Sequence, residues 1–384
     1  MKGCTVSAFA LLLLIACGPA GPGQPEFDPA ATYMAMVESL DPDQPGRGRD
    51  VFNDTVKDRA MAYALILRAE ANRYAHTRAA DALARMRTCA RWLMDNHDLN
   101  GDGVPGYGLA DPWDAFGDGT INPPFQEYII TTAMCIEALQ DHYAVAPDTT
   151  GLQAMRQLVV GCVEPFLSDR YDAPGGMLAY SRNPNDAHYD VFNSSVYFAG
   201  QLQRISTWVT DTVLKTRLEA KAARIMATLA TWSRDTGHGG ICWPYGTMAN
   251  SALNDLLHAS YIAEGIREYQ RHGGDRTIDL WRVMAHFDDF VRRGRWYEHS
   301  SPGWRDDPYA TRAWSLGQAL YTLALEGRLE EARSTLWPQL GQYHMGGGRF
   351  RLKRDDDRTL VRHEAHVLLG LSHLLFRPSA LGAP

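Results

Sequence analysis

The sequence has no excess of positive charge. Its 38 lysine and arginine residues are outnumbered by 45 aspartate and glutamate residues, which gives a formal net charge of −7. A protein whose main partner is nucleic acid needs a basic face for the phosphate backbone. The charge balance therefore argues against nucleic acid as a partner. A content of 45% hydrophobic and 22% charged residues is instead typical of a globular protein with a sizeable core.

Cysteine is also scarce, and no CxxC pair is present, so a structural zinc site is not expected. An even number of cysteines remains once the first seventeen residues are set aside. In an oxidising compartment these could form disulfides. Each also lies within or beside an apolar helical pattern, which is equally typical of buried free thiols. The four residues are Cys89, Cys135, Cys162 and Cys242.

The apolar run near the N-terminus, residues 8–15, is too short to span a bilayer and has the character of a secretory signal. The residues Ile15-Ala16-Cys17-Gly18 that end it resemble the lipobox of bacterial lipoproteins. That resemblance implies cleavage before Cys17 and a lipid on this residue. An ordinary cleaved signal peptide is the alternative.

From this pattern we expect a signal peptide over residues 1–16 and a flexible tether over 17–29, which is rich in glycine and proline. The protein would then belong to the bacterial cell envelope. Its lipid would anchor it to a membrane, either in the periplasm or at the cell surface.

A helical hairpin recurs along most of the remaining chain. In each pair the first helix is small and apolar, whereas the second carries more charge, which predicts an inner helix and an outer one. The expected pairs are 56–74 with 77–96, 125–143 with 152–167, 192–208 with 211–232, 251–270 with 277–293, and 310–325 with 329–340, followed by a last helix at 360–376.

The first helices of the pairs start roughly fifty to seventy residues apart, which is typical of a repeat architecture. A short helical segment at 30–40 could pair with the last helix and close a ring. We therefore expect an all-α fold, a single (α/α)6 toroid over residues 30–378, with short β-like loops at one mouth. Residues 379–384 would form a tail.

The loops that enter the inner helices place an aromatic residue shortly after glycine. In a ring such loops gather at one mouth, where aromatic faces can stack on sugars. The alternative is that these aromatic residues only close the end of the barrel. The loops are Gly106-Tyr107-Gly108, Gly175-Gly176 with Tyr180, Gly239-Gly240 with Trp243 and Tyr245, Pro302-Gly303-Trp304-Arg305, and Gly347-Gly348 with Phe350.

Three sets of short motifs stand out along the chain: Tyr171-Asp172 with Gly175-Gly176 and Tyr180, His188-Tyr189 with Gln201-Leu202-Gln203, and Pro302-Gly303-Trp304 with Gly317-Gln318-Ala319. With the hairpin repeat, they resemble the six-hairpin toroids of carbohydrate-active enzymes, and most closely the helical domain of D-glucuronyl C5-epimerases. In that family the Pro-Gly-Trp element precedes the Tyr-Asp-Gly element, whereas here it follows. The resemblance implies an enzyme that acts on a uronic acid within a polysaccharide.

The helix expected at 251–270 carries a polar stripe of Asn254, His258, Tyr261, Gly265 and Glu268 at steps of four and three residues. Such side chains can hydrogen-bond a substrate and transfer protons. A core helix whose polar groups are satisfied by neighbours would show the same stripe. Because the loop and helix recur around the ring, we expect Asn254 and His258 at the mouth, Tyr261 one turn deeper, and Glu268 in packing.

The other inner helices also begin with polar or aromatic groups, and helix N-termini attract anions. The basic residues Arg349, Arg351, Lys353, Arg354 and Arg358 of the last loop favour an acidic polysaccharide, although such a run can also be a solvated loop. The groups at the helix starts are Glu127 and Tyr128; Asn193; Asn254, Asp255 and His258; Arg312 and Trp314; and Arg362, His363 and Glu364.

On a uronate, the C5 proton becomes removable when the developing negative charge is neutralised. We expect Arg312, Asn193 and His363 to do this, His258 or Tyr261 to remove the proton, and Tyr189 to act on the opposite sugar face. Epimerases and polysaccharide lyases share this step, and neither needs a cofactor for it. The expected substrate-binding residues are Glu127, Tyr180, His188, Trp243, Tyr245, Asn254, Trp304, Arg305, His363 and Glu364.

Two other functions remain open. A glycoside hydrolase would need two carboxylates on either side of the scissile bond. The mouth offers Glu127, Asp190, Asp255 and Glu364, with no pair singled out. A lipoprotein that binds a glycan without changing it is the second alternative.

The segment Asp98-Leu99-Asn100-Gly101-Asp102-Gly103 resembles the first half of an EF-hand loop, with oxygen side chains at alternate positions. Asp98, Asn100 and Asp102 could therefore hold a structural calcium ion. The twelfth position is Leu109, so Asp111 or Asp114 would have to replace the closing glutamate. A turn rich in Asp and Asn, without a metal, is the alternative.

Overall fold

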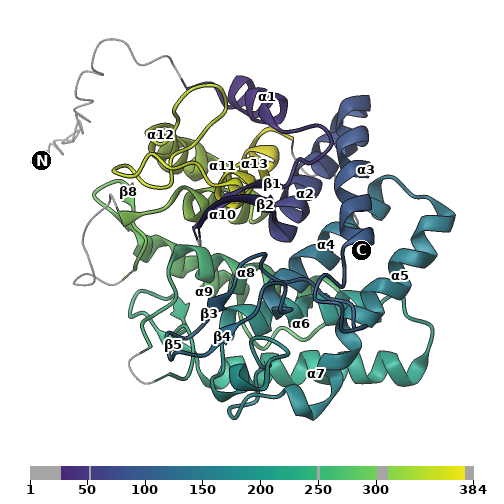
Figure 1. Ribbon diagram of the computed structural model, residues 1–384. Coiled ribbons are helices and arrows are strands. Elements are labelled where there is room, and N and C mark those ends of the chain that lie inside the picture. Colours follow the sequence, from purple (N-terminus) through teal and green to yellow (C-terminus); the bar gives the residue numbers. More distant parts are fainter. Residues whose placement is uncertain (1–26, 52, 249–250, 301–309, 377–384) are drawn as a thin grey trace, which may run out of the picture.

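The computed structural model describes residues 27–51, 53–248, 251–300 and 310–376, and in these ranges the chain is mostly helical (Figure 1). Each helix of the inner ring packs against the next, and the last packs against the first, so the ring is closed. The inner helices are α2 (Ala60–Thr77), α4 (Ile129–Val145), α6 (Phe192–Ser206), α8 (Leu256–Arg271), α10 (Ala313–Leu325) and α13 (Val361–Leu375).

The outer helices cover this ring, and each contacts the inner helix beside it in the chain. Helix α1 packs on α13, as expected for a ring that the N-terminal segment closes. The all-α (α/α)6 toroid is thereby confirmed. The outer helices are α1 (Pro29–Ser39), α3 (Ala80–Asp95), α5 (Thr149–Val163), α7 (Thr212–Thr231), α9 (Leu280–Ala285), and the pair α11 (Leu329–Glu331) and α12 (Trp337–Gly341).

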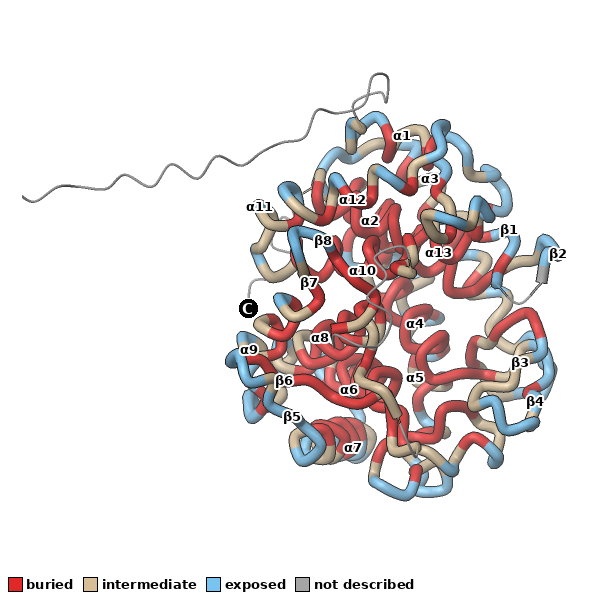
Figure 2. The backbone as a smooth tube through the Cα atoms, turned by 90° about the vertical axis from the view of Figure 1, so that its left-hand side faces the viewer, coloured by how far each residue is buried: buried red, intermediate tan, exposed pale blue. Residues whose placement is uncertain are grey.

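Burial follows the two rings (Figure 2). The inner helices are buried on all sides; in α4 every residue from Ile129 to Gln140 is buried. Helix α3 buries only Ala82, Met86, Cys89, Ala90 and Leu93, which recur at helical spacing on one face. The difference between apolar and charged helices in the sequence therefore reports which ring a helix belongs to.

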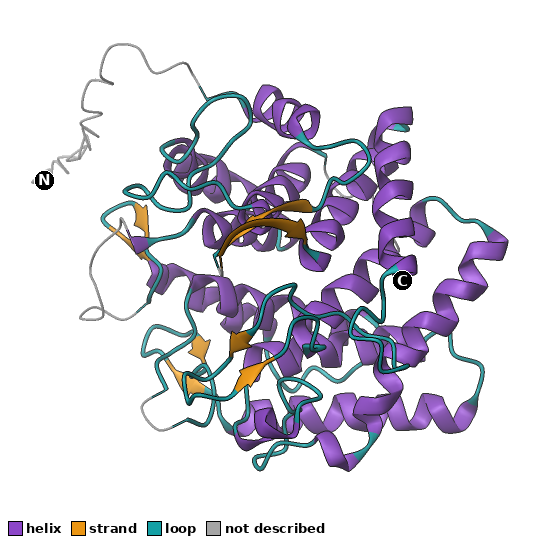
Figure 3. Ribbon diagram, in the orientation of Figure 1, coloured by secondary structure: helices purple, strands orange, loops and turns teal. Residues whose placement is uncertain are grey.

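Short antiparallel strand pairs occupy the loops before α2, α4, α8 and α10 (Figure 3). They are the β-like loops expected at the mouth. Their bounds are β1 (Arg47–Asp50) with β2 (Asn53–Asp58), β3 (Trp113–Asp114) with β4 (Ile121–Asn122), β5 (Arg234–Asp235) with β6 (Ile241–Cys242), and β7 (Val291–Arg292) with β8 (Arg295–Trp296).

Four inner helices, α2, α4, α8 and α10, begin three to five residues later than their apolar patterns suggest, and the contacts of α2 and α8 show the cause. Residues from 56 belong to β2 rather than to a helix, because Lys57 and Arg59 both bind Asp111 and keep the chain extended up to Ala60. Helix α8 begins at Leu256 rather than at 251. The amide of Asn254 donates to the carbonyls of the preceding loop, so this residue lies before the helix.

Two outer helices are shorter than expected. The segment 277–293 forms α9, a 3₁₀ turn at His286–Phe290 and strand β7. The segment 329–340 contains a π-helical stretch, Ala332–Leu336, ahead of Pro338. Proline has no N–H for the helical ladder, which accounts for the interruption at this point.

The cysteines that could have formed disulfides, Cys89, Cys135, Cys162 and Cys242, are buried free thiols. None of the helices in the described ranges is both long and apolar enough to cross a membrane. The expected signal peptide, Cys17 and the tail at 379–384 lie outside the described residues, as does the tether up to residue 26.

Replacing Gly370 with alanine is expected to destabilise the ring. A Cβ atom there would lie 2.3 Å from the carbonyl oxygen of Gly317, where α13 and α10 touch through their backbones. Overpacking of this kind costs about 1–3 kcal/mol. Thermal unfolding measures the loss. Gly161→Ala in α5 is the comparison, because its Cβ would meet a side chain, Pro105 at 2.8 Å, and no backbone atom; a loss in Gly161→Ala as large as in Gly370→Ala would contradict the special cost of the backbone contact.

Candidate functional site

All inner helices begin at one end of the ring, the mouth, and Arg312 there links the starts of two of them. From the N-cap of α10 it donates to Oε1 of Glu298 at 2.8 Å and to Oδ2 of Asp255, the N-cap of α8, at 3.0 Å. The other oxygen of Asp255, Oδ1, binds Nδ1 of His258 at 2.7 Å. The structure thus joins Arg312 and His258 through one carboxylate.

Asp255 fixes the orientation of the His258 ring. Burial alone would raise the pKa of Asp255, but His258 and Arg312 outweigh it and hold the pKa below its usual range. The carboxylate is therefore ionised, and Nδ1 of His258 must carry the proton of their hydrogen bond. In the neutral imidazole, Nε2 is then left as a base, and the ring is partly exposed at the mouth.

Tyr261 lies one helical turn below His258, with its ring centroid 6.0 Å from that of the histidine. Its hydroxyl is 2.7 Å from Nε2 of His366 in α13. Nδ1 of His366 donates to the carbonyl of Arg362 at 2.7 Å, so Nε2 must accept from the tyrosine. Burial raises the pKa of Tyr261 and lowers that of His366 to about 3. Tyr261 stays protonated, which favours His258 as the base.

His363, at the start of α13, has buried nitrogen atoms without partners. Only 1% of its surface is exposed, and neither ring nitrogen has a hydrogen-bond partner. Its ring stacks on Trp314, with the centroids 4.0 Å apart and the planes at 5°. Burial, and then the nearby charge of Arg362 and Arg312, lower the pKa of His363 well below its usual value. Buried polar atoms without a hydrogen-bond partner are rare in folded proteins and often mark a site that a ligand completes.

The guanidinium groups of Arg312 and Arg362 lie 4.6 and 4.9 Å from the ring centroid of Trp314. Arg362 donates to Asp50 of β1 at 2.9 Å. Each of these cations is therefore held in place by a carboxylate. Together they surround His363 with donors that can bind a developing oxyanion.

An aromatic wall continues the mouth on the other side of His258. The ring of Tyr245 lies 5.0 Å from that of His258, and its hydroxyl is hydrogen-bonded to Tyr180 and Asn193. Asn193 also donates to Asn254 at 3.4 Å. The remaining rings of this wall are Trp113, Phe116, Tyr128 and Tyr189, at centroid distances of 5.1 to 5.9 Å from one another or from Tyr180.

Other glycine-linked aromatics pack inward instead. The indole N–H of Trp243 donates to the carbonyl of Leu229 in α7, and the hydroxyl of Tyr107 donates to that of Leu93 in α3, both at 2.8 Å. Phe350 is buried against Phe27. The expectation that the aromatic residues of these loops face a sugar is therefore wrong for these three. Trp243 and Tyr107 donate their polar hydrogens to outer helices, and Phe350 packs its ring against Phe27. Trp304 and Arg305 lie outside the described residues.

Three expected binding residues lie apart from this cluster. Glu127 is buried beside the loop of Asp98 and Asp102, His188 is exposed at the end of a 3₁₀ turn, and Glu364 binds Arg349. Asp190, a possible hydrolase carboxylate, accepts the backbone N–H groups of Gly175 and Met177. The basic last loop is largely neutralised by ion pairs: Arg349 with Glu364, Arg351 with Asp357, and Arg358 with Asp356.

Three residues of the site were not expected from the sequence: Glu298, His366 and Asp50. His366 follows Arg362 and His363 at helical spacing, so a polar stripe on α13, like that on α8, could have revealed it. Glu298 lies in the loop 14 residues before Arg312, and Asp50 on β1 lies 312 residues from Arg362. No local pattern indicates such pairs.

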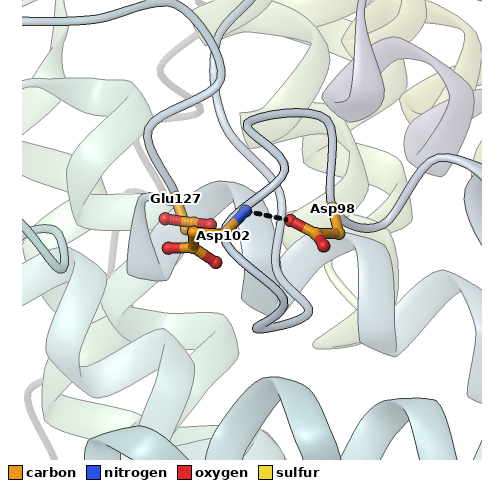
Figure 4. Close-up of side chains that lie close together, drawn as sticks. All are labelled: Asp98, Asp102 and Glu127. Atoms are coloured by element: carbon orange, nitrogen blue, oxygen red, sulfur yellow. Dashed lines mark hydrogen bonds between the residues drawn. The ribbon is translucent and has the colours of Figure 1, made fainter.

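The expected calcium loop gathers carboxylates, but a cation already lies among them. Asp98, Asp102 and Glu127 have ligand atoms within 4.8 Å of one another (Figure 4). Arg182 binds Asp102 at 2.5 Å and Glu127 at 3.3 Å, and the amide of Asn100 donates to Glu127 at 2.7 Å. Glu127 is therefore the third carboxylate of this loop, a position for which Asp111 or Asp114 was expected. Asp111 instead binds Lys57 and Arg59, and Asp114 accepts the N–H groups of its own loop.

Calcium binding at Asp98, Asn100 and Asp102 stays a prediction, and Arg182 is expected to compete with the ion. Replacing Arg182 with alanine removes that charge and should strengthen calcium binding, which isothermal titration calorimetry measures. Arg182→Ala combined with Asp98→Asn is the control, since it removes a ligand. A complete absence of heat in both the wild type and Arg182→Ala would show that the loop is a metal-free turn.

Stability is expected to fall as the pH decreases below about 6.5, because burial lowers the pKa of His366 and of His373 to about 3 each. Between these values the unfolded chain binds protons that the folded chain does not. Each such histidine then removes about 1.4 kcal/mol per pH unit. Thermal unfolding from pH 7.5 to 5 measures the slope. His373→Gln should flatten it relative to exposed His238→Gln; identical slopes would contradict the buried neutral state.

No protein-family model matches the sequence, and no curated protein matches it either. Solved structures do match. A D-mannose isomerase superposes with a TM-score of 0.62 at 12% identity, over 92% of this chain and 99% of that one. A sugar epimerase from a ruminal bacterium gives 0.58 at 10% identity, over 90% and 98% of the two chains. An unsaturated glucuronyl hydrolase specific for heparin also gives 0.58 at 10%, over 90% and 94%. Likenesses at this identity show the shared (α/α)6 fold.

Proposed function

We propose that the protein is a carbohydrate-active enzyme that removes the C5 proton of a uronic acid residue in a polysaccharide. The observation that carries the proposal is the Asp255–His258 pair at the mouth, next to two anchored arginines and a buried histidine without partners. The similar structures include a sugar epimerase, an isomerase and a glucuronyl hydrolase, which agrees with a sugar substrate.

In this mechanism Nε2 of His258 takes the proton from C5. Arg312 and Arg362 neutralise the charge that then develops on the carboxylate. His363, on α13, is separated from α8 in the ring by α10, so the two histidines come from two sides of the same site. The neutral ring of His363 offers an N–H that can hydrogen-bond the developing oxyanion, and Tyr189 of the aromatic wall is the group expected to return a proton to the opposite sugar face, which gives the epimer. Loss of the 4-oxygen instead gives a lyase product.

Hydrolysis is less well supported. It needs a carboxylic acid that is protonated at the site. Of the carboxylates expected for it, Asp255 binds Arg312, and Asp190 accepts two backbone N–H groups. Burial raises the pKa of Glu127 and of Glu364, but these two bind Arg182 and Arg349, apart from the His258 cluster. Carboxylates committed to cations in this way are poor proton donors.

A second candidate is isomerisation or 2-epimerisation of a neutral sugar, in which the proton comes from the carbon next to the carbonyl group. It is favoured by the same pairing of Arg312 and Arg362 with carboxylates, which leaves the mouth without a large excess of positive charge. The first chemical step is unchanged. Only the group that the arginines bind differs.

Product analysis separates these functions. The protein is incubated with a panel of uronic acid polysaccharides and with free reducing sugars, and products are followed by ultraviolet absorbance, reducing-end assay and NMR. Inverted C5 without absorbance supports an epimerase, and an unsaturated product supports a lyase. New reducing ends alone support a hydrolase, and a ketose or a C2 epimer supports the second candidate. Binding without turnover on every substrate would overturn the proposal in favour of a glycan-binding protein.

We also propose that the chain is anchored to a membrane of the bacterial cell envelope by a lipid on Cys17. The proposal is supported by the lipobox-like residues Ile15-Ala16-Cys17-Gly18. Mass spectrometry of the mature N-terminus should show a diacylglycerol adduct on Cys17. In the Cys17→Ala variant the adduct should be absent and the protein should leave the membrane fraction. An unmodified N-terminus in the wild type would contradict the anchor.

A further inference from the structure

A cavity of about 340 Å³ lies beside the first turn of α13; of the residues expected at the mouth, Glu364 lines it, whereas His258, Arg312 and His363 do not. Its walls are the C-terminal end of α1, strand β1 and the first turn of α13, joined by Arg349 and Thr359 from the last loop. This volume falls within the range of small-molecule sites, about 300–1,000 Å³. None of the chemistry proposed above uses it.

One wall of the cavity carries two arginines, and the lining also contains Asp41, whose Oδ1 already accepts the N–H groups of Asp43 and Gln44. Arg47 and Arg49 lie on either side of Gly48 in β1, where the pairing with β2 becomes irregular, and both line the cavity. Arg47 reaches Asp58 at 3.3 Å, and both side chains of that pair are substantially exposed. Arg49 has no ion-pair or hydrogen-bond partner among the described residues. An anion that enters the cavity therefore meets a guanidinium group that is free to bind it.

The facing wall is rigid and polar. Oε1 of Glu364 accepts from Nε of Arg349 at 2.8 Å and from the N–H of Phe350 at 3.0 Å, and Arg349 also donates to Thr359 at 2.5 Å. Oε2 of Glu364 has no partner within the ranges that the structure describes. A fixed carboxylate oxygen of this kind is a suitable acceptor for sugar hydroxyl groups.

Strand β1 connects this cavity with the arginines beside His363. Asp50, directly after Arg49, is buried and binds Arg362, one of the two arginines beside His363. Gly48 packs directly on Val361, where an added Cβ would lie 2.5 Å from that side chain. The first turn of α13 thus presents Arg362 and His363 to the mouth and Glu364 to the cavity.

We propose that this cavity is a second glycan site that binds a carboxylate-bearing sugar unit. Arg49, helped by Arg47, binds the carboxylate, and Glu364 accepts hydrogen bonds from ring hydroxyls. The choice of a sugar rests on the proposed function, whereas the negative charge rests on the arginines alone. Because β1 also holds Arg362, a sugar bound here lies next to the strand that fixes the mouth, as expected for a neighbouring unit of a polymer.

The test follows methyl NMR signals of Leu40, Val56 and Val361, which line the cavity, while glucuronic acid is added to the full chain. Their chemical shifts should change with the glucuronic acid concentration and reach a plateau in the wild type. The same should be seen in His258→Asn, because that substitution alters the mouth and not the cavity. In Arg49→Glu the apparent affinity should fall at least tenfold. Arg91→Glu, a charge reversal at an exposed position of α3, should bind like the wild type. Thermal unfolding confirms that each variant is folded.

Two further ligands make the outcome decisive. Glucose, which has no carboxylate, should bind at least tenfold more weakly than glucuronic acid, and so should acetate, which has no ring. If acetate binds as tightly as glucuronic acid, the cavity is only a general anion site. If Arg49→Glu binds glucuronic acid as tightly as the wild type does, the cavity is not the binding site. Either result overturns the proposal. Binding lost in Arg49→Glu, without turnover on any uronate, would leave this site standing and reject the proposed function.

Discussion

Replacing His258 with asparagine is expected to lower the rate of proton abstraction by about 10²- to 10⁴-fold, the usual contribution of one general base. The ring is oriented by a 2.7 Å bond from Nδ1 to Asp255, which leaves Nε2 as the basic atom. Asparagine can keep a hydrogen bond to Asp255 but offers no basic nitrogen. The fold should survive, because His258 is partly exposed.

The readout is the initial rate on whichever substrate the product analysis identifies, with thermal unfolding measured alongside. His238→Asn is the matched control, since this histidine is exposed in the loop between β5 and β6. Asp255→Asn should also reduce the rate, because an amide can hold the wrong tautomer of His258. A His258→Asn variant with at least half of the wild-type rate would remove His258 from the chemistry and direct attention to His363.

Replacing Arg68 with methionine is expected to cost about 3–5 kcal/mol of folding free energy, the loss typical when one partner of a buried ion pair is removed. Arg68 is the ninth residue of α2, so it lies about 12 Å below the mouth. Its guanidinium group binds Glu137 at 3.0 Å and Glu264 at 2.7 Å, and donates to the hydroxyls of Tyr197 at 3.0 Å and Tyr321 at 2.5 Å. One side chain therefore ties five inner helices together.

Chemical denaturation of Arg68→Met and of Arg91→Met, an exposed control in α3, measures the difference. The loss arises mainly because Glu137 and Glu264 are left buried without a cation. Adding Glu137→Gln and Glu264→Gln to Arg68→Met should therefore recover part of the stability. If Arg68→Met loses less than about 1 kcal/mol of folding free energy, the Arg68 network stabilises the fold no more than a surface ion pair does. That result would contradict its structural role.

The closed ring of helical hairpins could be predicted from the sequence because the pattern that produces it lies within each hairpin. Alternating apolar and charged helices separate the two rings, and the stripe of His258 and Tyr261 on α8 marked the face that points inward. The helix starts were less accurate, since they depend on distant partners. Lys57 and Arg59 extend the chain before α2 only because Asp111 lies opposite them in space.

The site itself was only partly predictable. Asp50 and Arg362 are 312 residues apart, and no local pattern indicates their hydrogen bond. The glycine-linked aromatics show the same limit. Tyr180 joins the wall of the mouth, whereas Trp243, which follows glycine in a similar way, gives its N–H to Leu229 and turns inward. An aromatic side chain of these loops faces the mouth or turns inward according to which hydrogen-bond acceptor it can reach. That acceptor is fixed only when the helices pack.

The most direct test of the account is solvent exchange at the sugar carbon. The protein is incubated with a uronic acid polysaccharide in D₂O, and NMR follows the C5 proton in the wild type and in His258→Asn. The account predicts that the wild type replaces this proton with deuterium and that His258→Asn does not. Full conversion to any product with the C5 proton retained would contradict it.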